Sequence, residues 1–193
     1  MPKTPFRAHL RSGTERILRA LPEESKRDLY VISFDIWRQD QDCRHPFLTV
    51  GHNTESQYAR VLATTPPDDP AEARWNYAYW ILEGFPTLGN TSADPRGRAL
   101  YLEEVRELGL WDGSEGPMDL SDPRHELLHE HFADVCSDLA RGLHADGVLT
   151  SALGRPVPVV LFDMDCPGWE VEATEAANPP ELIADFLAFQ GPG

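Results

Sequence analysis

The stretch of sequence that decides the fold is Leu29-Tyr30-Val31-Ile32-Ser33-Phe34-Asp35-Ile36-Trp37. Large apolar side chains recur at every second position, and β-branched and aromatic residues dominate, which predicts a β-strand. A polar turn at Gln39 to Arg44 and a second apolar run at Pro46 to Val50 follow. We therefore expect the two runs to form an antiparallel hairpin with a longish loop.

Segments with apolar residues at helical spacing flank this hairpin. The first runs from Phe6 to Leu21 and stops at Pro22. The second starts at the capping-box sequence Thr54-Glu55-Ser56-Gln57, in which the hydroxyl serves one backbone N–H and the amide returns to the cap. This pattern predicts a helix that ends near Ala63, with a loop from Thr64 to Pro70.

Two Asp-Pro pairs in the second half predict helix starts. Asp94-Pro95 and Asp122-Pro123 each place a capping carboxylate before a proline at the first helical position. The two helices are expected to end near Gly109 and near Gly142 or Gly147.

A third strand and a last helix complete the expected fold. The strand lies within Val157 to Met164, and Asn178-Pro179-Pro180-Glu181 caps a helix whose Leu182, Phe186 and Phe189 face the core. The fold class is α+β, with a small antiparallel or mixed sheet covered by several helices. The length of 193 residues and the 41% of apolar residues predict a single domain, 1–193, with its core at about 5–190.

The charge balance bears on the class of partner. Thirty-two acidic residues against seventeen basic ones give a formal net charge of -15. Such a chain repels phosphate backbones, so we expect no nucleic-acid partner, whereas a basic protein would be attracted. Solubility is the other ordinary reason for an acidic composition.

Neither a leader nor a membrane segment is expected. Residues 1–21 carry charges every few positions, and the longest apolar stretch, Val157 to Met164, is far shorter than the roughly 20 residues of a membrane helix. Cys43, Cys136 and Cys166 are odd in number and widely spaced, which is typical of reduced thiols. We therefore expect a cytoplasmic location and no membrane partner.

One short motif suggests zinc chemistry. His125-Glu126-Leu127-Leu128-His129 fits HExxH, in which both imidazoles bind zinc from one helix face and the glutamate activates the metal-bound water. The third ligand that a catalytic zinc needs is absent from the usual places, and the helix is expected to start only at Pro123. Boundary residues beside an apolar stripe are the plainer interpretation, so we expect no cofactor.

A second motif resembles a catalytic motif of phosphatases. Val159 to Asp165 has the strand-then-DxD form of the first motif of haloacid-dehalogenase-like phosphatases, in which the first aspartate attacks phosphorus. Only 28 residues follow Asp165, too few for the rest of that machinery, and Pro167 stands where a threonine is expected. Asp163 and Asp165 are therefore expected to end a buried strand.

Aromatic residues gather in the segment Ala71 to Glu83, which we expect to be a helix with Trp75, Tyr79 and Leu82 on one face. Trp75 and Tyr79 would then pack on the sheet. Tyr77 and Trp80 would lie on other faces of that helix and are the better candidates to anchor a partner, with Trp75 as a third.

In order and spacing, several segments resemble the bacterial domain-of-unknown-function family 4303. They are Asp28 to Phe34, His52-Asn53-Thr54-Glu55, Arg74-Trp75 with Trp80, Phe132 to Gly147, Val159 to Asp165 and Asn178-Pro179. The resemblance implies a single α+β domain without an assigned activity, of a kind suspected to neutralise toxins as immunity proteins. Where that family tends to have an acidic residue before its second tryptophan, this chain has Tyr79.

Two functional hypotheses follow. The first is a non-enzymatic protein-interaction domain of the immunity type, whose acidic and aromatic surface receives a basic, toxin-like protein through Trp80, Tyr77 and Trp75. The alternative is a zinc-dependent hydrolase with His125 and His129 as metal ligands and Glu126 as catalytic base. Oligomeric state is left open.

Overall fold

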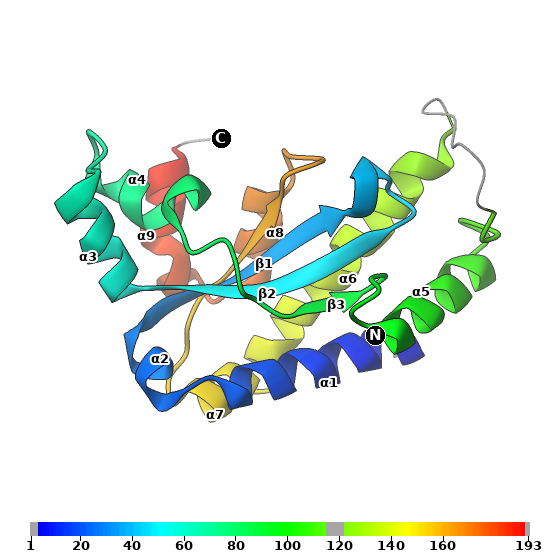
Figure 1. The fold of residues 1–193 in the computed structure, drawn as a ribbon, viewed down its shortest axis with the longest axis horizontal. Helices are drawn as coiled ribbons and strands as arrows, with labels where there is room; N and C mark the ends of the chain where they lie inside the picture. The colour runs from blue at the N-terminus through cyan, green and yellow to red at the C-terminus, as the bar shows by residue number, and fades with distance from the viewer. Residues whose placement is uncertain (1–3, 115–121, 192–193) are drawn as a thin grey trace.

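A four-stranded mixed sheet organises the molecule in the computed structural model, which describes residues 4–114 and 122–191 (Figure 1). The strands are β1 (Leu29–Arg38), β2 (Pro46–Thr54), β3 (Thr87–Gly89) and β4 (Val159–Asp163). Their order is β3-β2-β1-β4, in which β1 pairs antiparallel with β2 and parallel with β4. The expected antiparallel hairpin, the third strand and the α+β class are confirmed, and the sheet is mixed. The outermost parts of the expected domain range, 1–3 and 192–193, lie outside the described residues.

Helices and connecting loops make up the rest of the described chain. Their bounds are α1 Pro5–Ala20, α2 Glu23–Asp28, α3 Glu55–Thr64, α4 Pro70–Trp75, α5 Pro95–Glu107, α6 Arg124–Ala145, α7 Val148–Leu153, α8 Glu170–Ala177 and α9 Pro180–Gln190, with short 3-10 turns η1 Gln39–Gln41 and η2 Tyr77–Tyr79. Of these, α2, α7 and α8 have no counterpart among the sequence-based predictions, nor does the short strand β3.

Two helix starts form as the sequence predicts. The Thr54 hydroxyl accepts a hydrogen bond from the backbone N–H of Gln57, and the Asp94 carboxylate accepts one from that of Gly97. Each side chain satisfies a backbone donor that the first helical turn leaves unpaired. The reciprocal half of the capping box is wrong, because the Gln57 amide donates to the carbonyl of Tyr79 instead.

Two other caps differ from expectation. At α6, Asp122 does not cap the helix across the proline; its carboxylate binds the backbone N–H and the guanidinium of Arg124, and the helix begins at Arg124. At α9, the Asn178 side chain points away from the helix start and hydrogen-bonds the backbone of Val159 in β4. In both cases another hydrogen-bond partner takes the side chain that the sequence pattern assigns to the cap.

The expected helix from Ala71 to Glu83 breaks after one and a half turns. It ends at Trp75, and the Asn76 side chain accepts from the N–H of Ala78 to start the separate turn η2. An asparagine that captures the backbone in this way favours a turn over a continuous helix. The expectation that Trp75, Tyr79 and Leu82 share one helical face is therefore wrong.

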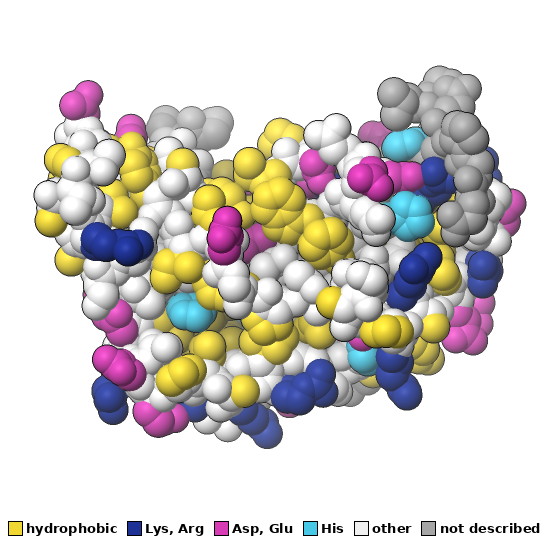
Figure 2. Space-filling model, in the orientation of Figure 1, with side chains coloured by type: hydrophobic (Ala, Val, Ile, Leu, Met, Phe, Trp, Pro, Cys, Tyr) yellow, Lys and Arg dark blue, Asp and Glu magenta, His cyan; other side chains and the backbone are white. Residues whose placement is uncertain are grey.

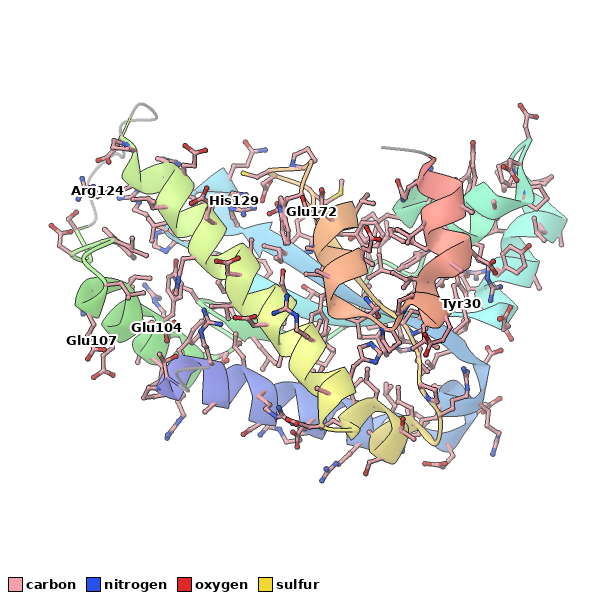
Figure 3. The ribbon with its side chains drawn as sticks, turned by 180° about the vertical axis from the view of Figure 1, so that it is seen from behind. Tyr30, Glu104, Glu107, Arg124, His129 and Glu172 are labelled. Carbon is pink, nitrogen blue, oxygen red and sulfur yellow. The ribbon has the colours of Figure 1, made fainter. Side chains whose placement is uncertain are left out.

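The apolar core lies on one face of the sheet. Ile32, Phe34 and Ile36 of β1 meet buried side chains of α1, α5 and α6 on that face. The layer of α6 and α8 lies behind the sheet in Figure 1 and in front of it in Figure 3. A smaller cluster forms where β1 and β4 meet α4 and α9, and its members are Tyr30, Val31, Trp75, Trp80, Val160, Ile183 and Phe186.

The outer edge of β4 is covered by two polar side chains, one in α8 and one directly after this helix. The N–H of Leu161 donates to the Thr174 hydroxyl at 3.0 Å. Asn178 pairs with both backbone groups of Val159, accepting from its N–H at 2.8 Å and donating to its carbonyl at 2.7 Å. Three outward backbone groups of this edge strand, the N–H and carbonyl of Val159 and the N–H of Leu161, are thus hydrogen-bonded to side chains.

Within the described ranges, no helix combines the length and the apolar composition that crossing a bilayer requires.

Candidate functional site

The two motifs that the sequence singles out meet at one end of the sheet, around a buried ion pair. Arg38 ends β1 and Asp163 ends β4, and these strands run parallel, so their ends lie together. The guanidinium binds the carboxylate through two hydrogen bonds, Nη1 to Oδ1 at 2.5 Å and Nη2 to Oδ2 at 2.8 Å. Backbone N–H groups of Asp165 and Cys166 also donate to Oδ1, and both charged side chains are almost fully buried. Sequence reasoning missed Arg38 because its partner lies 125 residues away.

His129 of the HExxH motif joins this pair. Arg38 Nη2 donates to His129 Nδ1 at 2.6 Å, so Nδ1 carries the lone pair and the ring hydrogen of the neutral imidazole lies on Nε2. Burial and the neighbouring guanidinium lower the pKa of His129. The neutral ring with its proton on Nε2 presents a donor, not a metal ligand, on the side away from Arg38.

His125 has a different partner. Its Nδ1 lies 2.7 Å from the Sγ of Cys43, and its Nε2 is buried with no hydrogen-bond partner in the part of the chain that the structure describes. Burial raises the pKa of Cys43 to about 12, and the charge of Asp42 adds to the effect. At neutral pH the sulfur is therefore a thiol and not an activated thiolate nucleophile.

The zinc-hydrolase hypothesis requires three ligands around one position. In residues 4–114 and 122–191, no group of three His, Cys, Asp or Glu side chains is placed to hold a metal ion. The Nδ1 atoms of His129 and His125 instead contact Arg38 Nη2 and Cys43 Sγ, while Glu126 is exposed to solvent. The geometry around His125 and His129 does not fit a zinc centre.

A groove lies over the buried ion pair, between α6 and the segment that leads into α8. We call it the α6 groove. Its volume is about 520 Å³, and its lining residues are Glu126, His129, Glu130, Ala133, Asp134, Pro167, Gly168 and Trp169. Figure 3 views this side of the molecule, where α6 carries His129 and the neighbouring α8 carries Glu172.

The negative charge in the α6 groove is concentrated on one wall, which is formed by α6. Glu126, Glu130 and Asp134 recur at intervals of four along α6, so they lie on the same helix face, and all three are exposed. Trp169 forms part of the opposite wall, with its ring centroid 6.0 Å from that of His129. The indole Nε1 of Trp169 is buried and has no acceptor among the described residues. The groove therefore offers three carboxylates and an aromatic wall.

The aromatic residues predicted as partner anchors are placed mainly in the smaller core cluster. Trp75 and Trp80 are each 5% exposed, and Trp80 Nε1 donates to the carbonyl of Arg74 at 2.8 Å. The expectation that Trp80 lies on an outer helix face is therefore wrong, since the helix ends before it and the chain turns inward. Tyr77 is half-buried, with its ring centroid 4.8 Å from that of Phe162. None of the three lines the α6 groove.

The fold and this site together define a single α+β domain with an acidic groove at the end of a mixed sheet. Comparison with protein-family models, with curated proteins and with solved structures gives no match. The resemblance to family 4303 and the function it implies therefore stay predictions.

Proposed function

We propose that this chain is a cytoplasmic protein-interaction domain of the immunity type, which binds a basic segment of a toxin-like protein in the α6 groove. The observation that carries the proposal is the lining of that groove, where three carboxylates on one face of α6 lie beside the indole of Trp169. A volume of about 520 Å³ falls within the range of typical ligand clefts, so it can hold more than one side chain.

The chemistry of the groove favours a cationic occupant. A lysine or arginine side chain can place its charge near Glu126, Glu130 or Asp134 and pack its aliphatic stem on Trp169, where the ring face also attracts a cation. The net charge of -15 adds long-range attraction for a basic protein and opposes nucleic acid.

Charge reversal in the groove tests the proposal. The probe is a blocked decapeptide of alternating lysine and alanine, titrated at low salt and at about 0.5 M salt, where charges are strongly screened. We expect binding at low salt, weakening at high salt, and loss of at least about tenfold in affinity in a Glu130→Lys, Asp134→Lys double variant.

A matched control is available on α5. Glu103 and Glu107 are likewise exposed and four residues apart, so Glu103→Lys with Glu107→Lys changes the net charge equally away from the groove. Equal loss of affinity in both double variants would show that only overall charge matters and would overturn the groove as the site.

The immunity role adds a biological test. The protein encoded by the neighbouring gene is the first candidate partner if it is basic. Co-expression with this chain should relieve any growth arrest that the candidate causes, and the groove double variant should fail to do so. Relief by the groove variant equal to that by the unaltered chain would contradict a role for the groove.

A further inference from the structure

A second polar feature lies on the other face of the sheet, away from the α6 groove. Ser33 and Asp35 are successive residues on that face of the central strand β1, and the Ser33 hydroxyl donates to Asp35 Oδ2 at 3.0 Å. Asp35 is 3% exposed, and its Oδ1 has no hydrogen-bond partner in the described chain. A buried carboxyl oxygen without a donor is costly to maintain, so it calls for a physical reason.

Aromatic rings surround this carboxyl group. Phe162 is the register neighbour of Asp35 in β4, and the ring of Tyr77 packs at a tilt against the ring of Phe162. Phe85 approaches from the segment between η2 and β3; a Cβ added at Gly51 would lie 3.0 Å from its ring and collide with Ser33 Oγ. Ser33 and Asp35 therefore lie under a half-buried cover of Tyr77, Phe85 and Phe162.

No cation balances Asp35 from within the described residues. Burial raises the pKa of Asp35 to about 7, opposed only by the Ser33 hydrogen bond and by no charged neighbour among the described residues. The titratable group that faces it is Tyr77, whose own pKa is raised by burial first and by the charge of Asp35 second. The ionised carboxylate of Asp35 could therefore be neutralised by one positive charge from a bound molecule.

The surrounding face is open and apolar. Of the described helices, none crosses its middle in Figure 1, and hydrophobic side chains gather there in Figure 2, with charged side chains mostly near the margin. Trp37 and Phe47, register partners in β1 and β2, are half-buried on this face, and Leu82 in the covering segment is 46% exposed. Aromatic side chains such as these are enriched at the centres of protein interfaces.

We propose that Asp35 binds the primary ammonium group of a lysine side chain, presented by a partner protein that docks on this sheet face. Charge complementarity identifies the occupant, because the unmatched group at the centre of the apolar face is a carboxyl. Lysine fits better than arginine, since Oδ2 is engaged by Ser33 and one free oxygen suits a point charge rather than a guanidinium fork. The rings of Tyr77 and Phe162 pack on the lysine stem and attract its charge. Entry requires the half-buried Tyr77 ring to swing aside.

The proposal deepens the partner chemistry of the proposed function but uses a different surface, so each can fail alone. The probe is a blocked Leu-Lys-Leu tripeptide, compared with its Nζ-acetylated and Leu-Arg-Leu counterparts. We expect the lysine peptide to bind and to shift the NMR signals of Tyr77 and Phe162, with affinity reduced at least about tenfold by acetylation, by replacement with arginine and by Asp35→Asn.

Proton release on binding distinguishes binding at Asp35 from binding in the α6 groove. Calorimetry near pH 6 in two buffers should show proton release on binding, because the lysine ammonium requires the ionised form of Asp35, and Asp35→Asn should abolish the release. The Glu130→Lys, Asp134→Lys variant should bind the tripeptide unchanged.

Three results would overturn the inference. They are absence of binding, binding that depends on Glu130 and not on Asp35, and equal binding of the arginine peptide. Ser33→Ala provides a second variant that leaves the carboxyl in place. By freeing Oδ2 it should shift preference from the lysine towards the arginine peptide, and an unchanged preference would refute the argument from the single free oxygen.

Discussion

Replacement of Asp35 by asparagine should make the folded protein more stable at neutral and alkaline pH. The pKa of this carboxyl rises from 3.8 to about 7 on folding, because burial disfavours its ionised form. Ionisation therefore destabilises the fold progressively as the pH rises from about 4 to about 7, and the loss then levels off. A pKa difference of roughly 3 corresponds to about 4 kcal/mol, which is an upper bound because the chain can relax around the charge. Asparagine has the shape of the protonated acid, keeps the acceptor for Ser33 and does not ionise.

Urea unfolding followed by tryptophan fluorescence measures this effect. Unfolding free energies of the unaltered chain and of Asp35→Asn should coincide near pH 4 and diverge to as much as about 4 kcal/mol in favour of the variant near pH 8. Asp68→Asn, in an exposed loop, should leave the pH profile unchanged. Parallel profiles for the unaltered chain and Asp35→Asn would refute the reasoning, because they would mean that the buried carboxyl does not change its ionisation on folding.

Four further outcomes follow from the described contacts. Arg38→Met leaves Asp163 buried without its cation and should cost about 3–5 kcal/mol in urea unfolding, and adding Asp163→Leu should recover most of that loss. Asn178→Ala removes the side-chain hydrogen bonds to β4 and should cost about 2–3 kcal/mol, with faster hydrogen exchange at the β4 amides. Asp94→Ala should cost about 1–2 kcal/mol at pH 7 through the lost cap of α5. Burial raises the pKa of Asp94, but backbone hydrogen bonds outweigh burial and lower the pKa below 3.8. The difference in unfolding free energy between the variant and the unaltered chain should therefore shrink as the pH falls past 3.8. Elemental analysis should find far less than one zinc per chain, because the neutral His129 ring carries its proton on Nε2; a stoichiometric zinc that His129→Ala removes would contradict this assignment.

Much of the fold could be predicted because its signals are local. The alternation through residues 29–37 and the caps at Thr54 and Asp94 depend only on neighbours within a few residues, and each forms as expected. The break after Trp75 could not be read from periodicity alone. There Asn76 captures the backbone, and the chain turns so that Trp80 enters the smaller core cluster, a tertiary contact that outweighs helical spacing.

The candidate sites illustrate the same limit. His129 and Asp163 each stood out in the sequence, but for separate chemistries, and the residue that joins them is Arg38 from the distant end of β1. Asp35 could have been singled out from the sequence, because it is an ionisable residue inside a mainly apolar strand. It gains meaning only from the absence of a cation among the described residues and from the rings that cover it.

The side-chain covering of β4 determines how this protein can associate with other chains. An uncovered edge strand offers a row of backbone donors and acceptors that can recruit a strand from another molecule, either in a functional complex or in a fibril. Asn178 binds the N–H and the carbonyl of Val159, and Thr174 binds the N–H of Leu161, so strand addition at this edge would first have to displace these side chains. At the opposite edge, β3 spans only Thr87–Gly89, which offers a short template. The hydrogen-bonded side chains at the β4 edge and the shortness of β3 therefore disfavour edge-to-edge growth of the sheet.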